Sequence, residues 1–267
     1  MAHPTRVTPG KTFDLGKIDP RDTSAVGEEE AAKARLSADV LEIDKLQDRL
    51  YAEGRRSLLV ILQGTDTSGK DGTIRGVFNS TGPLGVNVTA FRKPTEDELA
   101  HDYLWRAHRA CPRRGTIGIF NRSHYEDVLV VKVHKLASAK DIELRYRQIN
   151  DFERMLSENG TTILKFMLHI SKAEQKERLQ ERLDDPKKNW KFQAGDLDDR
   201  KLWDAFQAAY ATMLERCSTE WAPWHVIPSD RKWARNCAIA AVVRKTLEDM
   251  DPTYPKVDWD PKSITVK

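Results

Sequence analysis

The sequence predicts an α/β protein: a three-layer αβα sandwich in which helices cover both faces of a parallel sheet. Hydrophobic residues make up 39% of the 267 positions, which is enough for a real core. Apolar runs of strand length alternate with helical patterns, and this alternation is typical of a parallel sheet. The expected strands are 57–62, 86–91, 116–120, 161–170 and 225–228.

The N-terminal part divides into two segments. Residues 1–27 contain several prolines and glycines among polar residues, which favours an arm that wraps over a domain or stays mobile. Residues 28–54 have apolar positions three and four apart and end at Gly54, which predicts an amphipathic helix with a C-terminal glycine. No linker divides the strands into two sets, so we expect a single domain over 28–267.

Two later helices are expected to begin directly after strands. Thr95 with Glu98, and Ser171 with Glu174, have the spacing of a capping box. Residues 184–196 interrupt the rhythm with a proline and a glycine between helical patterns. We interpret them as a mobile insert.

Composition excludes several classes of protein. The 44 Lys and Arg against 41 Asp and Glu leave a net charge of +3, so there is no long basic or acidic tail. Three widely spaced cysteines favour neither a disulfide framework nor structural zinc. The longest apolar runs, 58–62 and 237–243, are too short to span a bilayer. We therefore expect a cytoplasmic protein without a membrane partner.

Four tryptophans are interpreted as core or interface anchors: Trp203, Trp221, Trp224 and Trp233.

A glycine-rich segment joins the first strand to a helix expected at 73–78. It has the Gly-x-x-x-x-Gly-Lys spacing of a phosphate loop. The N–H groups of such a loop gather at a helix N-terminus, where the helix dipole favours phosphate, and Lys70 neutralises the transferring group. The alternative is an ordinary strand-to-helix turn. The other residues expected to bind phosphate or nucleotide are Gly64, Thr65, Thr67, Ser68, Gly69, Asp71 and Gly72.

Two acidic residues of this loop are informative. Asp71 stands where the general motif has Ser or Thr, whose hydroxyl binds magnesium, so another residue must hold the metal. Asp66 lies inside the loop, where a carboxylate repels phosphate unless it coordinates metal or orients the attacking group. Asp66 therefore argues against an ordinary turn.

A polar run follows the expected strand 116–120 and contains Asn121, Arg122, Glu126 and Asp127. In a doubly wound sheet the carboxyl ends of the strands line the ligand crevice, so this run should face the phosphate loop. The alternative for Arg122 is a simple ion pair with a neighbouring carboxylate.

With these segments in view, the chain resembles the polyphosphate kinase 2 family, whose members move phosphoryl groups between inorganic polyphosphate and nucleotides. The form Asn-Arg-Ser-His-Tyr-Glu-Asp over 121–127 is similar to the class III branch, which phosphorylates both AMP and ADP. The residues that carry the resemblance are Gly64-x-Asp66-x-x-Gly69-Lys70-Asp71-Gly72, Phe120-x-Arg122-Ser-x-Tyr125, and a lid segment from Arg178 through Arg182 to Asp185-Pro-x-Lys-x-Trp190-Lys191.

The resemblance implies a P-loop kinase fold with a helical lid at about 178–200. It implies transfer of the terminal phosphoryl group of polyphosphate to AMP and ADP, giving ADP and ATP, reversibly and without a covalent intermediate. Magnesium (Mg²⁺) is the expected cofactor, with manganese (Mn²⁺) as an alternative. The long first helix and the many tryptophans favour a homo-oligomer.

Roles for individual residues follow from the same resemblance. Lys70 and the loop amides would bind the terminal phosphate of the acceptor, and Asp66 would orient or deprotonate the attacking oxygen. Arg122 would stabilise charge on the transferring group. The implied metal ligands are Asp66, Asn121, Glu126 and, as a further carboxylate, Asp127. The residues implied to close over the phosphates are Arg178, Arg182 and Lys191, although a solvated, salt-bridged helix face is the alternative for the two arginines.

Two stretches of the sequence contain basic residues and no acidic ones, which would suit a polyanionic substrate. Residues 103–125 carry five arginines and residues 186–195 carry three lysines, without an Asp or Glu in either. If they converge, they form an electropositive channel for polyphosphate.

Two other functions remain open at this stage. The enzymatic alternative is an ATP-dependent nucleoside monophosphate kinase of thymidylate-kinase type, against which Asp66 and Asp71 count. A non-catalytic polyanion- or RNA-binding module is the other alternative. No aromatic RNA-binding motif or recognition helix supports it, so no nucleic acid is expected as a partner.

Overall fold

The computed structural model describes residues 4–260 and 263–266, and a mixed six-stranded sheet forms its centre. The strand order is β1-β6-β5-β2-β4-β3. Neighbouring strands from β2 to β6 run parallel, and β1 pairs antiparallel with β6 at one edge. The five expected strands are confirmed. The bounds are β1 Thr5–Arg6, β2 Ser57–Gln63, β3 Val86–Ala90, β4 Ile117–Asn121, β5 Thr161–His169 and β6 Trp224–Pro228.

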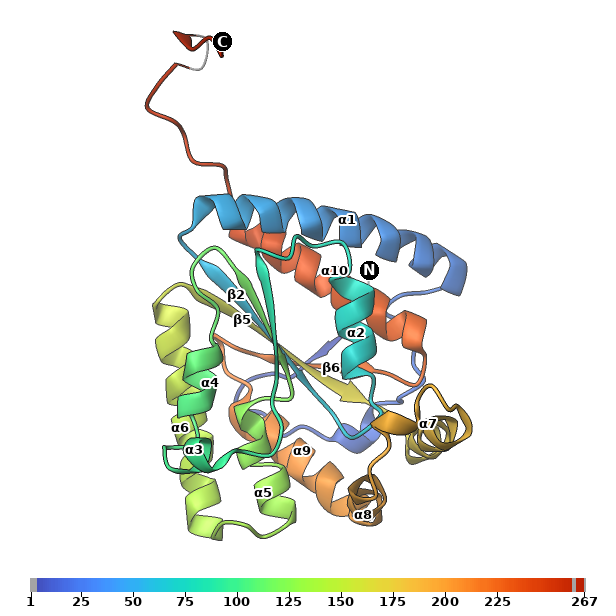
Figure 1. The fold of residues 1–267 in the computed structure, drawn as a ribbon. Helices are drawn as coiled ribbons and strands as arrows, with labels where there is room; N and C mark the ends of the chain where they lie inside the picture. The colour runs from blue at the N-terminus through green and yellow to red at the C-terminus, as the bar shows by residue number, and fades with distance from the viewer. Residues whose placement is uncertain (1–3, 261–262, 267) are drawn as a thin grey trace.

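Helices cover both faces of this sheet, as the predicted sandwich requires (Figure 1). One face packs against α1 (Glu29–Glu53), α2 (Lys70–Val77) and α10 (Lys232–Met250). The other packs against α6 (Ala139–Glu158) and α9 (Trp203–Cys217). The remaining helices are α3 (Glu96–Leu99), α4 (Trp105–Ala110), α5 (Val130–Val133), α7 (Lys172–Asp184) and α8 (Gly195–Lys201).

Local capping follows the sequence closely. The αL residue Gly54 ends α1, with its N–H donating to Leu50 O at 3.1 Å. Thr95 and Glu98 form a complete capping box. Ser171 accepts from the Glu174 N–H at 3.0 Å, but only this half of the second box forms, because the Glu174 carboxylate contacts an arginine one turn later.

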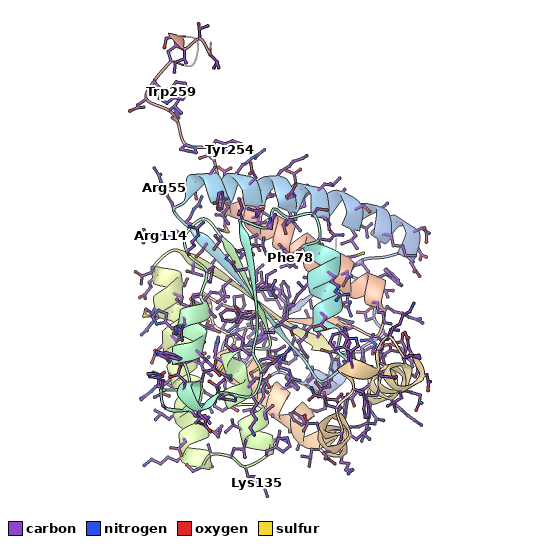
Figure 2. The ribbon with its side chains drawn as sticks, viewed as in Figure 1. Arg55, Phe78, Arg114, Lys135, Tyr254 and Trp259 are labelled. Atoms are coloured by element: carbon purple, nitrogen blue, oxygen red, sulfur yellow. The ribbon has the colours of Figure 1, made fainter. Side chains whose placement is uncertain are left out.

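The N-terminal arm wraps over the domain. Its strand β1, which the sequence did not predict because it is only two residues long, extends the sheet at β6. Val7 donates its N–H to Trp224 O at 2.9 Å, and Val7 and Leu15 are buried. The C-terminal segment leaves the body past α1, where the Tyr254 hydroxyl donates to Asp48, and Trp259 lies farther out (Figure 2).

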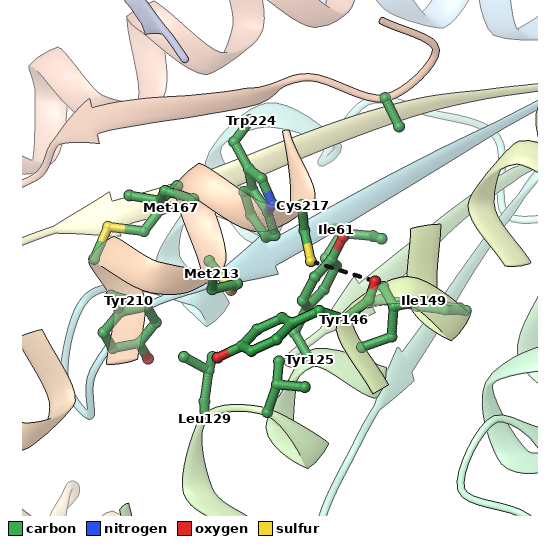
Figure 3. Close-up of a cluster of buried hydrophobic side chains, with 14 of the residues drawn as sticks. Ile61, Tyr125, Leu129, Tyr146, Ile149, Met167, Tyr210, Met213, Cys217 and Trp224 are labelled. Carbon is green, nitrogen blue, oxygen red and sulfur yellow. Dashed lines mark hydrogen bonds between the residues drawn. The ribbon is translucent and has the colours of Figure 1, made fainter. Parts of the chain in front are cut away.

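Apolar contacts hold the two layers to the sheet. All seven residues of β2 are buried, as expected for the central strand of a parallel sheet. On the α6 and α9 side the cluster includes Tyr125, Tyr146, Met213 and Trp224 (Figure 3). Among the described residues, no helix is both long and apolar enough to cross a membrane.

Candidate functional site

The glycine-rich segment forms a tight loop between β2 and α2. Gly64 and Gly69 have φ values of 151° and 105°, and a Cβ on Gly64 would lie 2.7 Å from Leu168 O. Thr67 also lies in the left-handed region, with a φ of 64°. The helix α2 begins at Lys70, so it starts three residues earlier than predicted and its N-terminus belongs to the loop.

Lys70 crosses the interior of this loop. Its ammonium donates to Gly64 O at 2.8 Å, Thr65 O at 3.1 Å and Ser68 Oγ at 3.4 Å. Burial and, next, the nearby Arg122 charge lower the pKa of Lys70 to about 8, although Asp66 and other carboxylates oppose the shift. The ammonium is therefore a buried charge that an added phosphate would stabilise.

Asp66, Arg122 and Glu126 meet at the carboxyl ends of β2 and β4. Arg122 Nη2 donates to Asp66 Oδ1 at 2.5 Å, and Arg122 Nη1 donates to Glu126 Oε2 at 3.1 Å. The Glu126 carboxylate raises the pKa of Arg122, so this group is charged at any working pH. The polar run after β4 thus faces the phosphate loop, as the parallel-strand argument predicted.

The backbone under this contact is unusual. Arg122 has a φ of 60°, which is uncommon outside glycine, and its N–H donates to Leu62 O at 3.0 Å. This turn reverses the chain after β4 and brings both charged side chains, Arg122 and Glu126, to the same edge of the sheet.

Asp71 of the loop contacts Asn121 at the end of β4 and Lys191 of the lid segment. It accepts from Asn121 Nδ2 at 2.7 Å and lies 3.4 Å from Lys191 Nζ. Partial burial acts to raise the pKa of Asp71, but the Asn121 hydrogen bond and the Lys191 charge outweigh it and lower the pKa. Lys191 therefore brings a cation of the lid segment to a side chain of the loop.

The two lid arginines contact protein groups in this conformation. Arg182 donates to Asp196 Oδ2 at 3.0 Å and to Lys191 O at 3.2 Å, so it supports the segment that carries Lys191. Arg178 differs from the expectation that it lies over the phosphates. It is buried, pairs with Glu174, and donates to Thr67 O at 2.8 Å, because α7 packs against the outer side of the loop.

Asp127 was expected as a further metal ligand, but it turns to other partners. Its carboxylate faces Arg145 at 3.4 Å and Arg106 at 3.9 Å. Burial raises the pKa of Asp127 despite these cations. The 3₁₀ turn over His124–Asp127 points neighbouring side chains in different directions, so Glu126 joins the site and Asp127 does not.

The arginine run does not converge as a whole on the phosphate loop. Arg113 and Arg114 precede β4 and Arg122 follows it, so a strand of about 17 Å separates them. Arg114 lies beside Arg55 at the far end of the sheet (Figure 2). In the lid, Lys188 pairs with Glu181 and Asp185, which neutralise it.

A cavity above the loop includes residues that the sequence analysis missed. Its walls include Trp203, which was interpreted as a core or interface anchor, and Tyr210 from the same helix. Asp199 also lines it and pairs with His134 at 2.8 Å. The one signal for this role in the sequence is the spacing of residues 203 and 210. They are seven positions apart, which places them on the same face of a helix.

A buried polar network packs beneath the turn that follows β4, residues 122–127. Glu153 on α6 accepts from Tyr125 at 2.7 Å and from Lys165 at 2.5 Å, and its other contact is His124 at 3.3 Å. Lys165 also donates to Tyr125 at 2.7 Å and to the Cys217 carbonyl at 2.7 Å. All four network side chains are fully buried, and Glu153 and Lys165 satisfy each other and Tyr125, whereas His124 Nδ1 has no hydrogen-bond partner among the described residues.

The oxygen donors at the loop suit magnesium. Mg²⁺ prefers oxygen ligands and commonly uses one or two carboxylates together with water and substrate phosphates. Asp66 and Glu126 supply two carboxylates on either side of Arg122. In the described part of the chain, no group of three or more His, Cys, Asp or Glu converges to make a metal site from protein alone. The donor set therefore fits an ion shared with a phosphate ligand.

Comparisons with known proteins agree in the family that they indicate. The family model described as Polyphosphate kinase 2 (PPK2) matches residues 27–255. The AMP/ADP-polyphosphate phosphotransferase of Meiothermus ruber is 52% identical over 98% of both chains. The ADP-polyphosphate phosphotransferase of Rhodopseudomonas palustris is 40% identical over 94% of this chain and 91% of its own. The crystal structure of polyphosphate kinase 2 from Arthrobacter aurescens TC1 has a TM-score of 0.92 at 42% identity, covering 98% of this chain and 97% of its own.

Proposed function

Because the chain belongs to the polyphosphate kinase 2 family, we propose that it transfers the terminal phosphoryl group of inorganic polyphosphate to AMP and to ADP, giving ADP and ATP. Phosphoryl transfer between polyphosphate and nucleotides is the activity of the family. Support for two acceptors comes from the name of the Meiothermus ruber relative and from Glu126, which stands in the class III form of the motif.

One observation carries this proposal: the phosphate loop with Lys70 faces the Asp66–Arg122–Glu126 contact across the carboxyl ends of β2 and β4. A site for phosphoryl transfer needs cations on the phosphates and a group that positions the nucleophile. Lys70 and Arg122 supply the first and Asp66 supplies the second. The fold thus brings Lys70, Arg122 and Asp66 to one edge of the sheet.

The reaction is an in-line displacement. An oxygen of the acceptor's terminal phosphate, oriented by Asp66, attacks the terminal phosphorus of polyphosphate. The bond between that phosphorus and the bridging oxygen breaks, and the shortened chain leaves with the bonding electrons. Lys70 and the loop N–H groups bind the acceptor phosphate, while Arg122 offsets charge on the transferring group.

Magnesium is part of the proposal. Asp66, Glu126 and Asn121 would hold it, and we leave Asp127 out because Arg145 and Arg106 engage its carboxylate. When bound, the ion neutralises phosphate charge. The lid, about 178–200, contributes Lys191 directly and Arg182 as its support, and it would limit hydrolysis by excluding water.

The test is a product profile from purified protein with magnesium and long-chain polyphosphate. AMP should give ADP and ATP, and ADP should give ATP, as measured by nucleotide chromatography. Replacing polyphosphate with ATP as the only donor to AMP tests the nucleoside monophosphate kinase alternative. Turnover with ATP and none with polyphosphate would overturn the donor assignment.

A further inference from the structure

A third arginine contacts the phosphate loop and does not line the cavity. Arg235 belongs to the first turn of α10, is 3% exposed, and places Nη1 3.4 Å from Ser68 O. Its Nε and Nη2 also donate to the side-chain oxygen of Asn236, at 3.1 and 3.0 Å. The guanidinium thus lies directly against the loop backbone.

Arg235 also explains two glycines of the motif. A Cβ on Gly69 would lie 1.8 Å from Arg235 Nη1, and a Cβ on Gly72 would lie 3.0 Å from Nη2. Gly69 is needed for its φ of 105° as well, but Gly72 has an ordinary helical backbone. At Gly72, therefore, a side chain would crowd the guanidinium and require it to shift, whereas the backbone itself would accept one.

Two arginines hold consecutive carbonyls of the loop. Arg178 from α7 donates to Thr67 O at 2.8 Å, and Arg235 from α10 contacts Ser68 O. In a trans peptide the C=O and the next N–H point in opposite directions, so the Ser68 contact directs the Gly69 N–H away from Arg235. Gly69 is the N-cap residue of α2, and the N–H groups at a helix N-terminus are the ones that bind phosphate.

The charge of Arg235 is not balanced locally. Among the described residues, no carboxylate lies within 4.0 Å of its guanidinium, whereas Arg178 pairs with Glu174 at 2.7 Å. Burial and the neighbouring Arg178 charge lower the pKa of Arg235 to about 10. A buried cation without a carboxylate is costly in the free protein, and a polyanion at the loop would offset that cost.

We propose that Arg235 is a positioning residue for phosphate binding: it directs the Gly69 N–H toward the ligand and holds an unpaired positive charge that bound phosphate offsets. The inference rests on the phosphate-binding role proposed for residues 64–72. It assigns to α10 a part in the site that none of the three motifs of the sequence includes.

A positioning role and a purely structural role for Arg235 predict opposite changes in the stability of the ligand-free protein. Arg235→Met removes the charge and keeps much of the apolar stem. We expect its melting temperature without ligand to equal or exceed that of the wild type. The stabilisation by ADP or by inorganic tripolyphosphate with magnesium should shrink, and the dissociation constant of at least one of them should rise about tenfold, or about 1.4 kcal/mol.

The matched control is Arg244→Met on the same helix. Arg244 pairs with Asp39 and Glu248 away from the loop, so its loss should leave both dissociation constants unchanged. Arg235→Lys keeps the charge but loses the planar fork, and we expect affinity between those of the wild type and Arg235→Met.

Gly72→Ala provides a second test that does not require loss of the arginine. In the wild type the new methyl group crowds the guanidinium and should weaken ligand binding by shifting it, whereas in Arg235→Met it should have no further effect. The proposal is overturned if Arg235→Met lowers the melting temperature equally with and without ligand and leaves both affinities unchanged. These binding measurements do not depend on turnover, so failure of the polyphosphate assay alone would not overturn them.

Discussion

Arg122 Nη2 lies 2.5 Å from Asp66 Oδ1, although the two residues are 56 positions apart in the chain. The contact exists because β2 and β4 are parallel neighbours, which places the residues after both strands at one edge of the sheet. Glu126 holds the other side of the same guanidinium. Arg122 is thus positioned by two carboxylates before any phosphate binds.

Replacing Asp66 with Asn should remove the group that orients the attacking oxygen. We expect kcat with AMP or ADP to fall about 100-fold or more, in the range typical of losing a positioned acid or base. The melting temperature should change little, because Arg122 keeps its contact with Glu126. Steady-state kinetics and thermal unfolding check this. A kcat within a few-fold of the wild type would remove Asp66 from the mechanism.

The low pKa of Lys70 predicts a pH limit on activity. In the free enzyme the ammonium is lost as pH rises through about 8, so kcat/KM should decline above that pH. Lys70→Arg, which stays protonated, should lack this decline even if its maximal rate is lower. A pH profile of kcat/KM for both proteins is the measurement. An identical alkaline decline in the two would point to another group.

The same shift has the opposite sign for stability. The ordinary pKa of 10.5 applies in the unfolded chain and about 8 applies in the folded one, so the unfolded state binds more protons between these values. The contribution of Lys70 to the free energy of unfolding should therefore rise with pH over that window. Denaturant unfolding of wild type and Lys70→Met at pH 8 and pH 10 isolates it: the free energy of unfolding of the wild type minus that of the variant should be more positive at pH 10 than at pH 8.

The buried Lys165–Glu153 pair should be a major determinant of stability. Lys165→Met leaves the Glu153 carboxylate buried without its cation, which should cost about 3 to 5 kcal/mol. Lys165→Met combined with Glu153→Leu should recover part of this loss. The control is Lys33→Met, whose ion pairs are on the surface and whose unfolding midpoint should not move. Urea unfolding tests all three, and a mild effect of Lys165→Met alone would show that the pair is dispensable.

The lid is tested through Lys191. Its contact with Asp71 brings a cation to the loop, so Lys191→Met should lower kcat/KM for polyphosphate by about tenfold and increase hydrolysis relative to transfer. Lys188→Met is the matched control in the same segment, because Lys188 pairs with Glu181 and Asp185. Equal losses in the two variants would indicate a general charge effect of the lid.

Much of the fold follows from local pattern. The five parallel strands, the long first helix and the Thr95 capping box can all be predicted from residues close together in the chain. Their periodicity and spacing match the repeat of a strand or a helix. Strand β1 was missed because two residues carry no periodicity, and its pairing depends on the distant strand β6.

By itself, the sequence determined the type of protein and the edge of the sheet at which its chemistry takes place, because the phosphate loop and the run after β4 both follow parallel strands. Only the tertiary structure decided which charged side chains reach that edge. Arg178 turns to the Thr67 carbonyl and Asp127 to two arginines, while Asp199 and Trp203 line the cavity. The physical reason is that a buried charge must find partners, and those partners come from elements far apart in the chain.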